Sequence, residues 1–173
     1  LFCGVGGLTK GLEQAGINVV AGIDFEPSCQ YAYEANNHAR FIQKDITTVT
    51  ADELKALYPQ SENIRILAGC APCQPFSKAG MQGGFEDEQG RGNLFYRIMD
   101  ILNEHKPEYV FLENVPNLKS HDGGNTYKVI SEQLSTLYDI ADDIISPHHF
   151  GIPQHRTRIY IVGRLKSLGG LRN

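Results

Sequence analysis

Apolar residues along this chain follow two spacings that predict two kinds of secondary structure. Short, nearly continuous apolar runs are typical of buried strands, whereas apolar residues three and four apart mark one face of a helix. Strands are expected at residues 18–23, 41–42, 64–68, 109–112, 140–145 and 159–162, and Leu1-Phe2 resembles the end of another. Helices are expected at residues 8–15, 26–36, 50–57, 93–105 and 127–137.

Strands and helices alternate up to about residue 138, which predicts an α/β fold with a mostly parallel sheet covered by helices on both faces. No helix separates the last two strands, so we expect them to pair antiparallel. The 173 residues suit a single domain with a core of its own. No apolar run is long enough to cross a bilayer.

Charge is distributed unevenly along the chain, although its net value is only −4. Residues 1–143 hold 11 basic and 20 acidic residues, whereas residues 144–173 hold 5 basic residues and no acid. A basic end on an acidic body could be one face of a phosphate-binding surface, although charge alone favours a solvated tail. Four cysteines without a regular pattern indicate free thiols in a reducing compartment.

One thiol, Cys73, lies between two prolines in the stretch 69–77, directly after the strand expected at 64–68. Each proline fixes its own φ and pushes the preceding residue toward extended geometry, so the loop should be stiff. A thiol fixed at the end of a strand is placed to act as a nucleophile. Cys70 and Cys73 could instead form a redox pair or half of a zinc site.

A glycine-rich turn, in which Gly4 and Gly6 follow Phe2, precedes the first expected helix. Such a turn lets the backbone approach a ligand closely and presents free helix N–H groups. Asp24 and Asp45 end the next two expected strands, where carboxylates suit the ribose and the amino group of a nucleoside. Both acids could instead cap helices.

Two further groups follow later strands. Glu113, flanked by apolar residues at the end of the 109–112 strand, should be partly desolvated and suited to proton donation, or it could cap the next turn. Arg156 and Arg158 lead into the last strand, where alternation would put both on one face. Paired guanidinium groups suit a phosphate or a polar base edge, although a solvated strand start is an equal alternative.

These motifs together resemble the cytosine-5 DNA methyltransferase family, of the bacterial type. The resemblance rests on four motifs in the family's order: Phe-x-Gly-x-Gly, Pro-Cys-Gln, Glu-Asn-Val and Gln-x-Arg-x-Arg. Intervening residues agree as well, among them those at 91–95, 120–122 and 151–154. The resemblance runs from Leu1 to about Arg164 and implies a Rossmann-like sheet that binds S-adenosylmethionine.

The resemblance also implies roles for individual residues. Cys73 would attack carbon 6 of a cytosine flipped out of the duplex, and Glu113 would bond the ring nitrogen and amino group. Arg158 would contact the base carbonyl, and Arg156 would brace the thiol loop. The residues implied to bind the cofactor are Phe2, Gly4, Gly6, Asp24, Phe25, Asp45, Pro72, Asn93 and Leu94. Residues 80–92 would close over DNA.

The implied protein is a methyltransferase of a restriction–modification system that acts on double-stranded DNA and releases S-adenosylhomocysteine. We expect it to be monomeric and cytoplasmic, nucleoid-associated when bound to DNA, and to use no metal and no membrane. Residues 1–173 would form one catalytic domain, with the target-recognition region and the closing helix outside this chain. Methylation of transfer RNA, a non-catalytic DNA-binding relative and a thiol–disulfide enzyme remain the alternatives.

Overall fold

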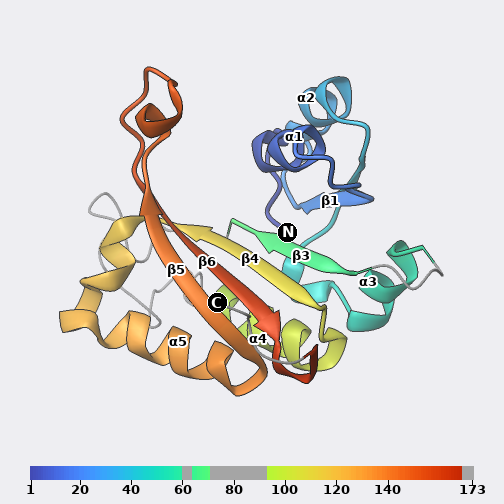
Figure 1. Cartoon of the computed structure of the whole chain (residues 1–173). Helices are drawn as coiled ribbons and strands as arrows, with labels where there is room; N and C mark the ends of the chain where they lie inside the picture. The colour runs from blue at the N-terminus through green and yellow to red at the C-terminus, as the bar shows by residue number, and fades with distance from the viewer. Residues whose placement is uncertain (60–63, 71–92, 169–173) are drawn as a thin grey trace. The chain divides into compact units, whose positions relative to one another are not determined.

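The computed structural model describes residues 1–59, 64–70 and 93–168, which belong to two compact units (Figure 1). The first unit spans Leu1–Asn63 and the second spans Ile64–Asn173. The single sheet expected from the sequence is represented by a two-stranded sheet in the first unit and a four-stranded sheet in the second. Each unit is described by itself below.

In the first unit, two short parallel strands alternate with helices. Strand β1 pairs with β2 in parallel register, with Gly22 opposite Phe41. The elements are α1 (Gly7–Gln14), β1 (Ala21–Asp24), α2 (Cys29–Asn36), β2 (Arg40–Gln43), a 3₁₀ turn (Ile46–Thr48) and α3 (Ala51–Leu57). The core centres on Tyr33, Ala39 and Phe41, with the rings of Tyr33 and Phe41 5.6 Å apart. The parallel pairing agrees with the α/β pattern of the sequence.

Helix boundaries in this unit follow from local capping. Thr50 and Glu53 form a reciprocal capping box at the start of α3, so this predicted start is confirmed. Helix α2 begins at Cys29 rather than at residue 26, because the Glu26 carboxylate accepts the Ser28 N–H and stabilises a turn before the helix. The strand expected at Leu1-Phe2 is not formed, since Phe2 has a φ of 55°.

In the second unit, a four-stranded sheet has the order β3-β4-β6-β5 (Figure 1). Its strands are β3 (Ile66–Gly69), β4 (Tyr109–Asn114), β5 (Tyr138–Ile145) and β6 (Arg158–Leu165), and its longer helices are α4 (Asn93–His105) and α5 (Asn125–Leu137). Strands β3 and β4 are parallel, and β6 is antiparallel to both β4 and β5. The predicted antiparallel pairing of the last two strands is confirmed. The insertion of β6 beside β4 was not expected.

Helices α4 and α5 lie on the same side of the four-stranded sheet (Figure 1). Most of the predicted apolar stripe is buried, with Ile98, Ile101 and Leu102 of α4 and Ile130 and Leu134 of α5 at most 4% exposed. The remaining predicted members, Leu94, Val129 and Leu137, are half-buried. The sheet packs tightly here, because a Cβ added at Gly163 would lie 2.7 Å from Val110 Cγ2. At this packing density, adding even one methyl group would force neighbouring atoms to shift.

Two charged contacts fix the strands of the second unit. Ahead of β3, Arg65 donates from Nε to Glu108 Oε2 (2.9 Å) and from Nη2 to Glu108 Oε1 (2.7 Å). This bidentate pair holds the pKa of Glu108 at about 2. Asp142 on β5 accepts from the Lys119 ammonium and the Tyr127 hydroxyl, which ties the turn after β4 and helix α5 to the sheet.

Candidate functional site: a glycine turn and an acid–arginine pair at strand ends

The glycine turn of the first unit has one open side and one packed side. Gly4 and Gly6 both take positive φ, at 50° and 91°, which a side chain would disfavour. Within the described part of this unit, a Cβ at Gly4 would meet no atom within 4 Å, whereas at Gly6 it would lie 2.8 Å from Tyr33 Cδ2 and closer still to Asn37 Nδ2. The turn therefore faces open space at Gly4 and rests on α2 at Gly6.

Asp24 connects the end of β1 to this turn. Its Oδ2 accepts the Gly4 N–H at 2.8 Å, and its Oδ1 accepts the Glu26 N–H at 3.1 Å. An ionised carboxylate offers about four acceptor positions, so these two bonds leave capacity for further donors such as ribose hydroxyls. Asp24 thus orders the backbone of the turn and remains able to accept from a ligand.

The other residues predicted to bind a cofactor in this unit differ in their surroundings. Phe25 is 65% exposed, as a ring available for stacking must be. Phe2 is half-buried at the start of the turn. Asp45 caps the 3₁₀ turn that follows it, since its Oδ1 accepts the Thr47 N–H and hydroxyl, each at 2.8 Å. The capping alternative left open for Asp45 is therefore realised, whereas Asp24 supports the turn.

In the second unit, Glu113 and Arg158 form an ion pair across neighbouring strands. Because β4 and β6 are antiparallel, the carboxyl end of β4 lies beside the start of β6, with Asn114 opposite Ile159. Arg158 Nε lies 2.8 Å from Glu113 Oε1, and both side chains are less than one-fifth exposed. Arg158 Nη1 also donates to the Thr157 carbonyl at 2.8 Å. The pair fixes both charged groups in a partly dry environment, where their electrostatic fields are strong.

Three further groups lie near this pair. Cys70 directly follows β3, whose register places Gly69 beside Leu112 and therefore Cys70 level with Glu113. Burial, and next the neighbouring Glu113 carboxylate, raise the pKa of the Cys70 thiol to about 11. Burial and then Glu113 likewise raise the pKa of Tyr160, whereas Arg158 and Arg156 oppose this shift. At neutral pH the Cys70 thiol and the Tyr160 hydroxyl thus stay neutral beside an ionised pair.

Arg156 has a different position from the one that alternation predicted. It lies in the irregular segment before β6 and is exposed, so the two-residue repeat of a strand begins only at Arg158. Its positive charge still acts on the Cys70 thiol and on Tyr160.

Some predicted site residues lie outside the described part of the chain. Cys73 and Pro72 are among them, as are residues 80–92. Asn93 is described only as the first residue of α4, and Leu94 is half-buried in the same helix.

When the second unit is considered by itself, an apolar groove of about 470 Å³ is lined by Phe111 and Tyr160, which lie two residues from Glu113 and Arg158 along their strands. It lies on β4, β6 and β5 and continues along the connection between β5 and β6. The rings of Phe111 and Tyr160 in its floor lie 5.5 Å apart. Its remaining lining consists of Ala141, Asp142, Asp143, Ile145, Pro147, Phe150, Ile152 and Val162.

The sequence analysis missed Cys70 and Tyr160 as neighbours of Glu113. Tyr160 is two residues from Arg158 on β6, so strand alternation could have placed both on one face. The position of Cys70 depends on the register between β3 and β4, which local patterns do not reveal. Within residues 1–59, 64–70 and 93–168, no three His, Cys, Asp or Glu side chains could together hold a metal ion. In the same ranges no helix is long and apolar enough to cross a membrane.

The fold is that of methyltransferases with a Rossmann-like sheet. A solved structure described as a putative DNA modification methyltransferase encoded within a prophage, from E. coli, superposes with a TM-score of 0.78 at 24% identity. The superposition covers 99% of this chain and 47% of that one.

Sequence similarity narrows this class to one family. The model of the C-5 cytosine-specific DNA methylase family matches residues 1–170, and the chain belongs to that family. It is 40% identical to the Type II methylase M.HgiDII of Herpetosiphon aurantiacus, over 93% of this chain and 45% of that protein. It is also 40% identical to the Type II methyltransferase M.HpaII of Haemophilus parainfluenzae, over 98% of this chain and 46% of that protein. The chain thus spans a little under half the length of these relatives.

Proposed function

We propose that the protein containing this chain transfers a methyl group from S-adenosylmethionine to carbon 5 of cytosine in double-stranded DNA. The observation that carries the proposal is the Glu113–Arg158 pair, an acceptor and a donor fixed 2.8 Å apart at the ends of adjacent strands. A polar base edge presents both donors and acceptors, so such a pair suits its recognition. Membership in the C-5 cytosine methylase family supports the same reading.

The first unit fits the adenosyl part of the proposed cofactor. Gly4 opens toward free space, Asp24 keeps acceptor capacity beside it, and the Phe25 ring is exposed next to Asp24. We propose that these residues hold the cofactor together with Phe2 and Gly6, while Asp45, Pro72, Asn93 and Leu94 complete its surroundings. When bound, S-adenosylmethionine supplies a methyl group made electrophilic by its sulfonium.

The chemistry of the base is assigned to this chain's own side chains. Cys73, as a thiolate, would form a bond to carbon 6 of the flipped-out cytosine, and the electrons displaced from the 5,6 double bond make carbon 5 nucleophilic. Glu113 would bond the ring nitrogen and the exocyclic amino group, where charge develops. Arg158 would donate to the base carbonyl, and Arg156 would brace the loop that carries Cys73. After methylation, loss of the carbon-5 proton and departure of the thiolate restore the aromatic base.

A covalent trap tests the nucleophile. Duplex DNA containing 5-fluorocytosine blocks loss of the carbon-5 substituent, so the protein should remain attached to it when S-adenosylmethionine is present. Cys73→Ser should form no adduct, whereas Cys29→Ser, a matched change elsewhere in the chain, should trap as the unmodified protein does. Equal trapping by the Cys73 variant would exclude Cys73 as the nucleophile.

Two alternatives are separated by further measurements. Methyl incorporation into transfer RNA but not into duplex DNA would show that the substrate is transfer RNA, with the same reaction mechanism. A thiol–disulfide enzyme would form a reversible disulfide between Cys70 and Cys73, so its activity would depend on oxidant. Such an enzyme would lose its activity in Cys70→Ala. The raised pKa of the Cys70 thiol, about 11, argues against that role because redox-active thiols ionise readily.

A further inference from the structure

The side chain of Tyr33 occupies space that two glycines leave empty. Tyr33 lies on α2, is 0% exposed, and fits between the glycine turn and strand β1. A Cβ at Gly22 would lie 2.5 Å from Tyr33 Cζ, and a Cβ at Gly6 would lie 2.8 Å from Tyr33 Cδ2. The ring thus sets the separation between the turn and β1, because neither backbone can approach it further.

Asn37 supports the same turn from the end of α2. Its Nδ2 donates to the Tyr33 carbonyl at 2.8 Å, and this atom is also the nearest neighbour of a Cβ built at Gly6. The residue is 9% exposed, and within the described part of the chain its Oδ1 has no hydrogen-bond partner. A buried acceptor of this kind costs stability, so its retention beneath the turn calls for a reason other than stability.

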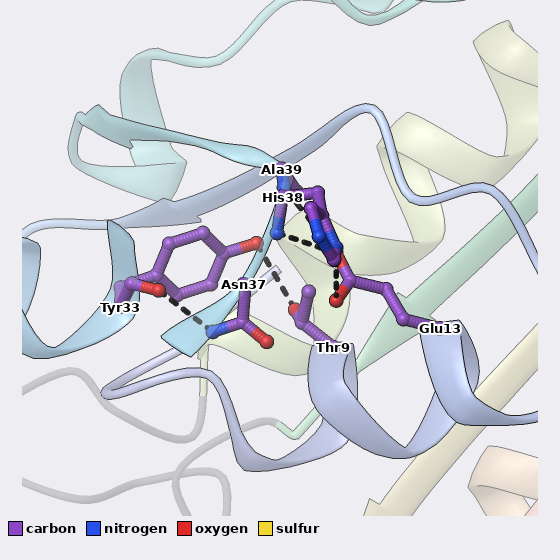
Figure 2. Close-up of polar contacts among 6 residues, drawn as sticks. All are labelled: Thr9, Glu13, Tyr33, Asn37, His38 and Ala39. Carbon is purple, nitrogen blue, oxygen red and sulfur yellow. Dashed lines mark hydrogen bonds and ion pairs between the residues drawn. The ribbon is translucent and has the colours of Figure 1, made fainter. Parts of the chain in front are cut away.

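Helix α1 is held at two points, one on α2 and one on the segment that joins α2 to β2 (Figure 2). Near its start, the Thr9 hydroxyl and the Tyr33 hydroxyl share a hydrogen bond of 3.0 Å. Near its end, Glu13 Oε1 accepts the N–H groups of His38 (2.9 Å) and Ala39 (3.3 Å). Partial burial opposes ionisation of Glu13, but these hydrogen bonds outweigh it and lower its pKa, so the carboxylate stays charged. A helix fixed at both ends cannot pivot to compensate for a shift of the turn.

From this geometry we infer that Tyr33 and Asn37 are positioning residues for the cofactor. They touch the turn from its packed side at Gly6, while the side at Gly4 stays open to a ligand. They set the height of the Gly6 peptide and, through Thr9, the direction of the N–H groups at the start of α1. The inference rests on the proposed role of the glycine turn in binding S-adenosylmethionine.

The test compares two conservative variants with matched controls in the protein that contains this chain. Tyr33→Phe removes one hydroxyl, and Tyr31→Phe, on the same helix but 86% exposed, is its control. Asn37→Ser removes the support beneath Gly6. Asn36→Ser is its control, because Asn36 Nδ2 donates to the Ala32 carbonyl at 2.8 Å in the same geometry on the exposed face.

Calorimetric Kd for S-adenosylmethionine should rise roughly threefold to tenfold in each of the Tyr33 and Asn37 variants, the range that one neutral hydrogen bond commands. The control variants should bind as the unmodified protein does. At saturating cofactor, kcat and the KM for DNA should stay within about twofold of the unmodified values, since positioning acts on cofactor affinity alone. Thr9→Val combined with Tyr33→Phe should cost little more than Tyr33→Phe by itself, because both changes remove one shared bond.

A lower Tm with unchanged cofactor affinity in both variants would overturn the inference, since it would assign them a purely structural role. If Asn37→Ser fails to fold, Tyr33→Phe decides the question. Failure of the unmodified protein to bind S-adenosylmethionine would instead remove the proposed function itself, so the two failures are distinguishable.

Discussion

Asp24 and Glu113 each lie near the carboxyl end of a strand, one in each unit, and their surroundings differ in kind. Asp24 accepts two backbone N–H groups and thereby shapes a turn. Glu113 is paired with the guanidinium of Arg158 on the neighbouring strand. A carboxylate that accepts from backbone organises the protein around it, whereas one paired with a side chain can exchange that partner for a substrate. We propose that the turn held by Asp24 is a preformed cofactor-binding site and that the Glu113–Arg158 pair binds the base.

The largest effect on catalysis is expected for substitutions in the Glu113–Arg158 pair. Glu113→Gln keeps the shape but removes the negative charge that we propose stabilises the reacting base, so kcat should fall by at least about 10²–10³-fold. The Kd for S-adenosylmethionine should stay near its unmodified value, because the first unit is unchanged. Single-turnover methyl transfer and calorimetry measure the two quantities. A full-rate Gln variant would contradict the proposed role of Glu113.

A smaller effect is expected for Asp24→Asn, and it should change cofactor binding rather than kcat. Asparagine has one acceptor oxygen, so the Gly4 or the Glu26 N–H loses its partner, and bonds to a charged acceptor are worth about 1.5–3 kcal/mol. The KM for S-adenosylmethionine should rise roughly tenfold or more, with kcat at saturation much less affected. A lower kcat with an unchanged KM for S-adenosylmethionine would contradict the proposed role of Asp24 in cofactor binding.

An intermediate effect on stability is expected in the second unit at Glu108. Its folded-state pKa of about 2 lies below the ordinary value, so the pair with Arg65 stabilises the fold above about pH 4.5 and is lost as pH falls toward 2. Glu108→Gln should lower the free energy of unfolding by about 1–2 kcal/mol at pH 7, a figure reduced for partial exposure. That difference should shrink at pH 2.5.

Denaturant titrations at the two pH values measure this change, and Glu104→Gln, an exposed carboxylate of α4, is the control. A Glu108 variant as stable as the unmodified protein at pH 7 would contradict the expectation.

The smallest effect is expected at Asp45 in the first unit. Asp45→Ala removes the cap over Thr47, which typically costs about 0.5–2 kcal/mol, and Asp45→Asn should restore it. Thermal melting measures both variants. If Asp45 also accepts from the adenine amino group, the KM for S-adenosylmethionine rises in the Ala variant only. An Asp45→Ala variant with unchanged Tm and unchanged KM would show that Asp45 neither stabilises the fold as a cap nor binds the cofactor.

Local patterns predicted the elements well because each depends on neighbouring residues. The apolar stripe and polar flanks of residues 93–105 match α4 at both ends, and Thr50 with Glu53 predicted the start of α3. The start of α2 was missed because the Glu26 carboxylate accepts the Ser28 N–H in a local turn before the helix, which apolar periodicity does not report.

Pairing between distant segments was harder to predict. Sequence spacing suggested that β5 and β6 pair antiparallel, but the place of β6 beside β4 depends on non-local hydrogen bonds. For that reason local patterns named Glu113 and Arg158 separately, and only the resemblance to the family placed both against one base. Local patterns also left the roles of Asp24 and Asp45 open, since the same residue type at a strand end either supports a turn or caps a helix.

The insertion of β6 between β4 and β5 has a consequence for biosynthesis. The ribosome releases Glu113 well before Arg158, and β6 must leave the exit tunnel before it can add to the edge of β4. Until then the nascent chain carries a carboxylate at the end of β4 with no cation from β6 beside it. The Glu113–Arg158 pair therefore forms only after β6 has been synthesised, and a product that ends before β6 lacks the pair even if its earlier elements have folded.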